Sequence, residues 1–213
     1  MNAIKVRDKY NTIKNSLTGQ DCFIVGSGPS LIGFDFSILD NRYTIGINHV
    51  VEHYDNLNCL IYADRIFLKS TSYDLHNFKG KIFASEKTIY QPEIQDLLDK
   101  DNFYVFDDNR SCISFDIVKD GLFHPTNTGI MAMNLALIMN ARRVYLLGYD
   151  YKYRGEQMHF YENKEHHNRY KEDKFVKKLD KMLHFCNYKD RFINLNPDSN
   201  LNLFTKKHLR SVL

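Results

Sequence analysis

Short, unbroken apolar runs recur along the chain, and most of them end at a polar residue or a glycine. A strand that is covered on both faces is apolar throughout, so these runs predict buried strands. They cover residues 22–25, 43–47, 59–63, 81–84, 103–106, 144–147 and 192–195. Apolar residues at helical spacing predict helices over 4–17, 129–140 and 174–186. The alternation predicts an α/β fold with a mostly parallel sheet and helices on both faces.

Length and composition restrict the class of protein. At 213 residues we expect residues 1–213 to form a single domain. Hydrophobic residues make up 43% and charged residues 26%, which excludes a disordered or fibrous chain. A net charge of +3 is too small to indicate a nucleic-acid partner. We expect neither a transmembrane segment nor a signal peptide. The 4 cysteines are far apart and form no CxxC pair, and most lie in apolar runs, so we expect no disulfide and no zinc ribbon, and therefore a cytoplasmic protein.

Candidate ligand-binding residues gather where the predicted strands end, because ligands of parallel α/β sheets bind beyond those ends. Residues 26–30 read Gly-Ser-Gly-Pro-Ser and follow the first strand. Their glycines allow backbone amides to approach an anion, although the same residues suit a simple turn between strand and helix. Residues 126–129 precede a predicted helix and are either helix caps or a phosphate site.

Asp64 and Asp150 also follow strands, and three roles are open to them. They could hold Mg²⁺ as a pair, bind a ribose, or cap a helix. The long polar segment 154–173 is expected to be a lid or active-site loop. It contains His166 and His167, which are candidate general bases, zinc ligands or exposed surface residues.

Several segments, in order, resemble the bacterial lipooligosaccharide sialyltransferases of glycosyltransferase family 42. Residues 23–31 are similar to the family's Gly-Asn-Gly-Pro-Ser-Leu loop, and Asn48 matches at the end of the second strand. Residues 128–151 resemble the family's Thr-Ser-Gly helix and its strand ending in Gly-Ile-Asp-Phe. Residues 194–199 resemble its Cys-Pro-Asn-Ser segment. The resemblance extends from residue 22 to about residue 204.

This resemblance implies a Rossmann-like sheet that binds a CMP-sugar donor without a metal or other cofactor. It implies inverting transfer of the sugar to the hydroxyl of a glycan acceptor, with His167 or His166 as the base. Lys152 and Tyr153 would stabilise the departing phosphate. The partners are then the donor and the acceptor, and a homo-oligomer remains open. The implied nucleotide-binding residues are Gly26, Ser27, Gly28, Asn48, Asp64, Thr128, Gly129, Asp150 and Tyr151.

Some positions depart from the family pattern and support alternatives. Ser27 and Asp64 stand where the family has asparagines, Lys152 replaces a tyrosine, and the arginine before the Thr-Ser-Gly segment is absent. The missing arginine and the altered tyrosine favour a non-catalytic nucleotide-binding module. The Gly-Pro-Ser loop and residues 62–64 also resemble the hydroxymethylpterin pyrophosphokinases and related flagellin-glycosylation proteins. That second resemblance implies an enzyme that uses Mg²⁺ and a nucleotide.

Overall fold

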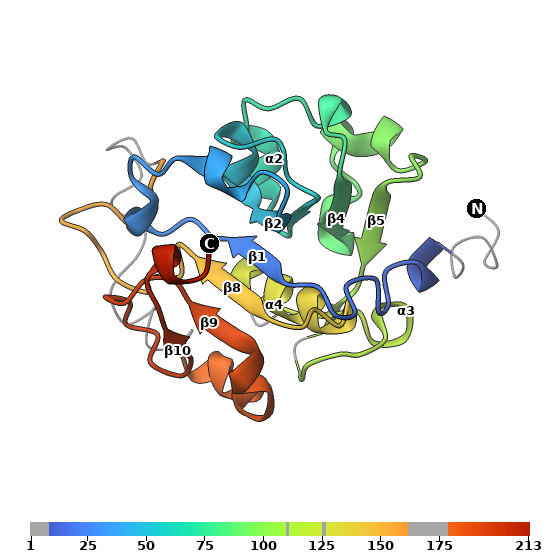
Figure 1. Cartoon of the computed structure of the whole chain (residues 1–213). Helices are drawn as coiled ribbons and strands as arrows, with labels where there is room; N and C mark the ends of the chain where they lie inside the picture. The colour runs from blue at the N-terminus through green and yellow to red at the C-terminus, as the bar shows by residue number, and fades with distance from the viewer. Residues whose placement is uncertain (1–8, 110, 125–126, 162–178) are drawn as a thin grey trace.

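The computed structural model describes residues 9–109, 111–124, 127–161 and 179–213. Its centre is an 8-stranded sheet in the order β10-β9-β8-β1-β2-β3-β4-β5 (Figure 1). Every neighbouring pair in this sheet is parallel. The strands are β1 (Cys22–Val25), β2 (Tyr43–Ile47), β3 (Cys59–Tyr62), β4 (Lys81–Ser85), β5 (Phe103–Phe106), β8 (Val144–Leu147), β9 (Phe192–Asn194) and β10 (Thr205–Lys206). The Rossmann-like α/β fold expected from the apolar runs is therefore confirmed.

The order in which strands are added to the sheet reverses at β1, although all strands stay parallel. From β1 the sheet grows outward through β5, and the chain then returns to place β8 on the other side of β1. Val25, the last residue of β1, pairs with Gly46 of β2 and with Leu147 of β8. The loops that follow β1 and β8 therefore meet at the carboxyl edge of the sheet. This reversal is where open α/β sheets bind their ligands.

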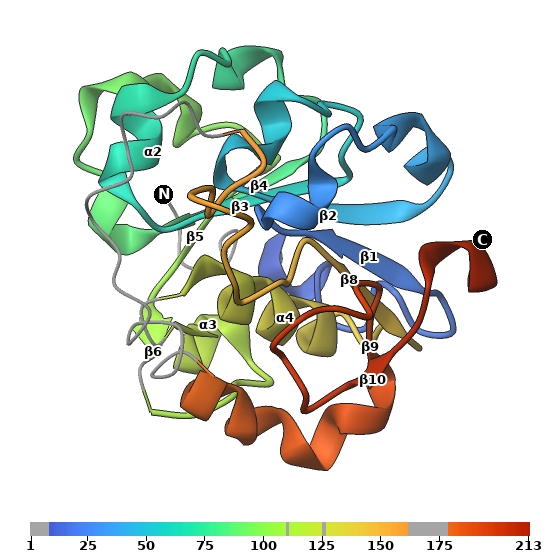
Figure 2. The ribbon, with the colours of Figure 1, turned by 90° about the vertical axis from the view of Figure 1, so that its left-hand side faces the viewer.

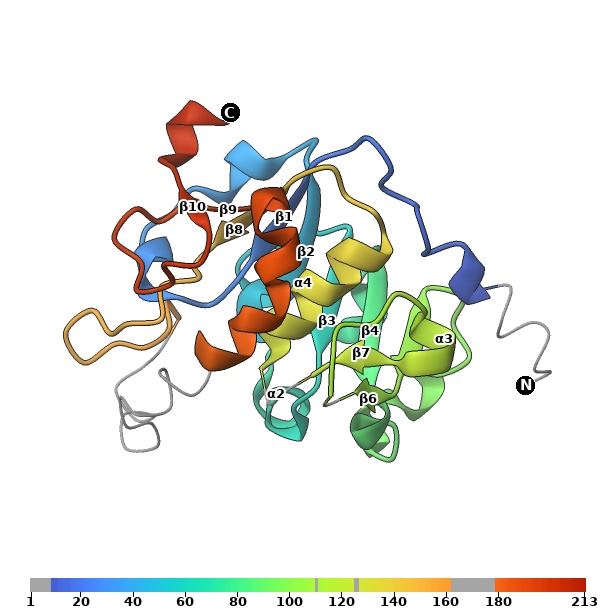
Figure 3. The ribbon, with the colours of Figure 1, turned by 90° about the horizontal axis from the view of Figure 1, so that it is seen from below.

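One face of the sheet is covered by α4 (Thr128–Ile138), which Figure 3 shows in front of the strands. Every residue from Ile130 to Ile138 is buried, so the helix has no solvent-exposed stripe. The spacing predicted one apolar side only. The other side of α4 is buried as well, because Met182 and Phe185, from the helical segment before β9, belong to the same core.

The opposite face is covered by short elements. Phe67 and Leu68 of α2 (Arg65–Ser70) pack there against β3 and β4 residues such as Tyr62 and Ala84. Helices on both faces are thus present, as expected. The remaining elements are η1 (Pro29–Leu31), η2 (Phe36–Leu39), η3 (Asn48–Glu52), η4 (Leu75–Asn77), η5 (Glu86–Thr88), η6 (Pro92–Leu97), α3 (Ile117–Asp120), η8 (Leu183–Arg191), η9 (Leu209–Ser211) and a small parallel pair, β6 (Asp108–Asn109) and β7 (Leu122–Phe123).

The helix predicted over residues 4–17 is wrong in its second half. Residues 9–11 are helical, whereas residues 12–17 form turns, and Asn15 has a positive φ of 61°. The backbone amides here bond the end of α4 instead of their own helix: Asn15 donates to the Ile138 carbonyl at 3.0 Å and Leu17 to the Met139 carbonyl at 2.7 Å. The apolar residues in this segment are therefore spaced as they are because they are buried, and the spacing does not reflect a helix.

The third predicted helix, over 174–186, is helical from residue 179 onward, and its first residues lie outside the described part of the chain. Among the helices that the structure describes, none has the length and apolar character that crossing a membrane requires.

Candidate functional site

The turn after β1 is held tightly against the end of β8. The Gly26 amide donates to the Leu147 carbonyl at 2.8 Å, and the Gly28 amide donates to the Gly148 carbonyl at 2.9 Å. Pro29 has no N–H to donate. The two glycine amides predicted to approach an anion are thus already bonded within the protein. Within residues 26–28, Ser27 is the residue whose backbone amide has no hydrogen-bond acceptor among the described residues.

Asp150 joins three loops at this edge. Its buried carboxylate accepts hydrogen bonds from the Ser30 amide at 2.6 Å, from the Ser30 hydroxyl at 2.7 Å and from the Asn196 side-chain amide at 2.7 Å. Ser30 follows β1 and Asn196 follows β9, so one carboxylate links the ends of β1, β8 and β9. Sequence reasoning singled out Asp150 as a nucleotide contact but did not find Asn196, its partner 46 residues along the chain.

Gly28 is required because Asp150 and Gly148 pack against it. A Cβ at this position would lie 2.5 Å from the Gly148 carbonyl oxygen and 2.6 Å from Asp150 Cγ. We expect Gly28→Ala to lower the free energy of unfolding by about 2–3 kcal/mol, because neither neighbour can move away cheaply. Urea denaturation followed by circular dichroism measures this loss.

Gly33→Ala is the matched control for this substitution. Gly33 has a φ of +73° and no atom within 4 Å of a Cβ, so its variant loses only about 1 kcal/mol, from backbone conformation. A Gly28→Ala protein that is at least as stable as the Gly33→Ala protein would contradict the close packing described above.

Tyr149 connects the turn after β1 to the first turn of α4. Its ring lies 3.1 Å from where a Cβ at Gly26 would sit, and its hydroxyl donates to the Gly129 carbonyl at 2.9 Å. Asn127 caps α4 by accepting a hydrogen bond from the Ile130 amide at 3.2 Å. The two segments predicted to bind the nucleotide, 26–28 and 128–129, therefore lie on either side of one aromatic ring. The positive end of the helix dipole faces the same region.

Tyr151 adds a constrained residue beside this helix start. Its φ is +51°, which is uncommon for a bulky side chain. Burial raises the pKa of the Tyr151 phenol, and a hydrogen bond to Asn127 opposes that shift only in part. Lys152 and Tyr153 follow directly, both half-buried. Unusual backbone conformations of this kind concentrate at binding sites.

Asn48 stands at the carboxyl end of β2 with a φ of +50°. β2 is the neighbour of β1 in the sheet, and the printed pairing of the two strands ends at Val25 and Gly46, two residues before Asn48. Its side-chain oxygen is buried and has no hydrogen-bond partner among the described residues. Buried acceptors are almost always satisfied, so this atom marks a place where a donor is missing.

Asp64 and Asp150 do not form a metal-binding pair. Asp64 is exposed and caps α2 by accepting the Ile66 amide at 2.8 Å. Its strand, β3, lies three positions from β8, which Asp150 follows. At about 4.8 Å per strand the spacing is roughly 14 Å, too far for both carboxylates to bind one ion. In the described part of the chain, no group of 3 or more potential metal ligands comes together.

The segment after Tyr151 returns to the turn that follows β1. Figure 2 shows it, in orange, crossing from the end of β8 toward α2. The Phe160 amide donates to the Ser27 carbonyl at 2.9 Å, and the Phe160 ring packs 5.0 Å from the His53 ring. His166 and His167, the predicted bases, lie outside the described residues, as does most of the predicted lid 154–173.

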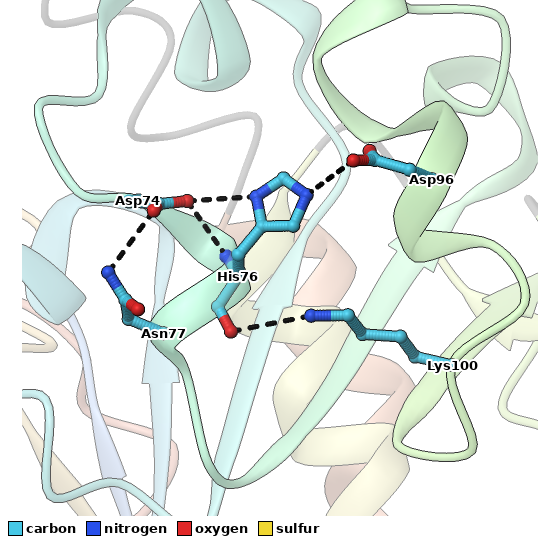
Figure 4. Close-up of polar contacts among 5 residues, drawn as sticks. All are labelled: Asp74, His76, Asn77, Asp96 and Lys100. Carbon is cyan, nitrogen blue, oxygen red and sulfur yellow. Dashed lines mark hydrogen bonds and ion pairs between the residues drawn. The ribbon is translucent and has the colours of Figure 1, made fainter.

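His76 has a structural role at the surface, because both of its ring nitrogens are hydrogen-bonded to aspartates. His76 Nδ1 lies 2.9 Å from Asp74 and its Nε2 lies 2.7 Å from Asp96, so both nitrogens are bonded (Figure 4). The hydrogen bonds to Asp96 and Asp74 raise the pKa of the imidazole. The network links η4 to η6 and leaves no nitrogen of His76 available for catalysis.

No protein-family model matches the sequence. The search of curated proteins likewise returned no match. The structure resembles that of the sialyltransferase CstII from Campylobacter jejuni, solved in complex with a substrate analogue, cytidine-5'-monophosphate. The TM-score is 0.54 at 18% sequence identity, over 89% of this chain and 85% of that chain.

The two proteins share a fold. The resemblance to the sialyltransferases noted in the sequence is thus supported at the level of the fold. At 18% identity the likeness carries no residue assignments. Nothing in the comparisons bears on the resemblance to the pyrophosphokinases.

Proposed function

We propose that this chain is a sialyltransferase-like glycosyltransferase that transfers a sugar, with inversion and without a metal, from a CMP-activated donor to a glycan hydroxyl. The observation that carries the proposal is the buried Asn48 side-chain oxygen, which has no hydrogen-bond partner among the described residues and stands at the carboxyl end of β2, the strand next to β1 and the reversal point. A fold shared with a sialyltransferase solved in complex with cytidine-5'-monophosphate supports the choice of ligand.

Each group has a role in this proposal. The Ser27 amide and the first turn of α4 at Thr128 and Gly129 bind the phosphate, and Asn48 Oδ1 accepts a hydrogen bond from the nucleoside. The acceptor hydroxyl gives its proton to a base, for which the sequence resemblance implies His167 or His166, and its oxygen bonds to the anomeric carbon as the bond from that carbon to the phosphate oxygen breaks. The electron pair leaves with CMP, and Lys152 and Tyr153 stabilise the charge that develops on it.

Nucleotide binding tests this function directly. CMP at a hundredfold excess over its Kd should raise the Tm by roughly 5–10 °C, because a ligand that binds only the folded chain stabilises it. EDTA should not change the shift. ATP with Mg²⁺ is the comparison, and stabilisation by that pair without any effect of CMP would instead support the pyrophosphokinase alternative.

Asn48→Gly tests the role of the Asn48 side chain in the same binding measurement. Glycine accepts the positive φ of this position, so the variant should fold with at least wild-type stability. It removes the acceptor, and CMP affinity should fall about tenfold. If Asn48→Gly binds CMP as tightly as the wild type, the unsatisfied oxygen has no part in nucleotide binding.

A further inference from the structure

Phe160 ties the segment that follows β8 to the turn that follows β1. Its backbone amide donates to the Ser27 carbonyl at 2.9 Å. Ser27 is the middle residue of the 26–28 turn, and the Gly26 and Gly28 amides bond that turn to the end of β8. The turn is therefore held by hydrogen bonds to two segments, and the second of these depends on where Phe160 lies.

The Phe160 ring is anchored among aromatic side chains from other elements. Its centroid lies 5.7 Å from the ring of Phe36 in η2 and 5.0 Å from the ring of His53, which follows η3. The ring of the adjacent Tyr161 is also 5.0 Å away. Aromatic rings at such separations attract one another beyond the burial of their area. These contacts fix the place at which the segment after β8 rejoins the site.

The other end of the same segment is fixed at Tyr151. The Tyr151 side chain is buried, and its phenol is hydrogen-bonded to Asn127, the N-cap of α4. The Tyr151 carbonyl accepts a hydrogen bond from the Asn200 side-chain amide at 3.2 Å. Segment 151–160 therefore runs from the start of α4 to the turn after β1, which are the two places that bind the phosphate in the proposed function.

Between these two ends the chain forms a hairpin. The Arg154 amide donates to the Gln157 carbonyl at 2.9 Å, and the Gln157 amide donates to the Arg154 carbonyl at 3.2 Å. Gly155 supplies the positive φ, +61°, that a two-residue hairpin turn needs. Figure 3 shows the hairpin, in orange, projecting from the sheet. A two-stranded hairpin is only marginally stable by itself, so its position depends on how its ends are held.

Lys152 and Tyr153 lie in this hairpin, directly after its Tyr151 end. Stabilising the charge on a leaving group requires the stabilising side chains to be held in place before the bond breaks. A hairpin fixed at Tyr151 alone could swing about that residue. The anchor at Phe160 removes this freedom.

We propose that Phe160 is a positioning residue for the transfer reaction. By closing the hairpin on the turn after β1, it holds Lys152 and Tyr153 where CMP leaves with the electron pair of the broken bond. The inference rests on the proposed function. Phe160 acts through Lys152 and Tyr153, so its effect on the rate must depend on their presence.

A mutant cycle between Phe160 and the two residues that it positions tests this role. The readout is CMP release from CMP-N-acetylneuraminic acid, with water or methyl β-galactoside as acceptor. Phe160→Ala should lower kcat about 10- to 30-fold while KM for the donor stays within about threefold, and Phe160→Tyr, which keeps a ring, should restore most of the wild-type kcat. In a chain that carries Lys152→Ala and Tyr153→Phe, adding Phe160→Ala should lower kcat by less than about threefold.

Limited trypsin digestion reports the position of the hairpin without any activity. Arg154 is exposed near the hairpin turn. Cleavage after Arg154 should be roughly fivefold faster in Phe160→Ala than in the wild type, because a folded chain is cut through local opening. Equal cleavage rates would mean that the Phe160 ring does not hold the hairpin, and the inference would be wrong.

Phe34→Ala is the matched control. The Phe34 ring lies 5.0 Å from Phe36, whereas the rings in contact with Phe160 in the described part of the chain are those of Phe36, His53 and Tyr161. The variant removes an aromatic ring from the same cluster without freeing the hairpin. It should keep the wild-type kcat and the wild-type rate of cleavage after Arg154.

Two further outcomes separate this inference from the proposed function. Full turnover by Phe160→Ala, or a loss that is undiminished in the chain with Lys152→Ala and Tyr153→Phe, would overturn the inference and leave the proposed function standing. A wild-type chain that fails to bind CMP, or that binds it and releases none from the donor, overturns both.

Discussion

Asp150→Ala is expected to lower the free energy of unfolding by about 4 kcal/mol. The substitution leaves the Ser30 amide, the Ser30 hydroxyl and the Asn196 side-chain amide without their acceptor. Hydrogen bonds to a charged acceptor contribute about 1.5–3 kcal/mol each, and these three act together, so their sum is not additive. Urea denaturation monitored by circular dichroism measures the loss. Because the loops after β1, β8 and β9 separate, CMP binding should disappear as well.

Ser30→Ala is the control that separates partial from complete loss of this link. It removes one hydrogen bond at a more exposed position and should cost about 1 kcal/mol. An Asp150→Ala chain that unfolds at the wild-type urea concentration, yet no longer binds CMP, would mean that the carboxylate serves the ligand and not the protein.

Asn134→Leu is expected to cost about 3–4 kcal/mol of stability. Asn134 is fully buried in the middle of α4. Its oxygen accepts the amides of Ser114, at 3.2 Å, and Phe123, at 2.8 Å, while its NH₂ donates to the Ser114 carbonyl at 2.7 Å. Leucine has a similar volume but leaves these backbone groups unpaired, and each unsatisfied buried group costs about 1–3 kcal/mol. Thermal and urea unfolding both report the change.

Met133→Leu, one residue earlier on the same buried helix, provides the comparison. A volume-conserving apolar exchange there should cost less than about 1.5 kcal/mol. Equal losses in the two variants would show that Asn134 contributes packing alone. If the polar contacts matter, Asn134→Leu should also weaken CMP binding, because Phe123 belongs to the strand that precedes the start of α4.

Local signals were sufficient for the strands, while the ligand site that they indicate stays a prediction. A buried parallel strand needs a continuous apolar run, so β1, β2 and β8 could be placed from the pattern before any contact was known. Strand-end chemistry then pointed to the turn at 26–28 and to Asn48, because ligand sites in such sheets occur at that edge. The caps at Asn127 and Asp64 were also readable, since short polar side chains at helix starts bond the free amides.

What the pattern could not specify are contacts between residues far apart in the chain. The Asp150 link to Ser30 joins residues 120 positions apart, and the turns at 12–17 form because their amides bond the end of α4. The unsatisfied Asn48 oxygen is a property of the folded chain in the same sense. Hydrogen-bond partners depend on which strands become neighbours, and an apolar strand carries no record of its neighbour in its own residues. Only the assembled sheet decides which polar groups are bonded within the protein and which remain for a ligand.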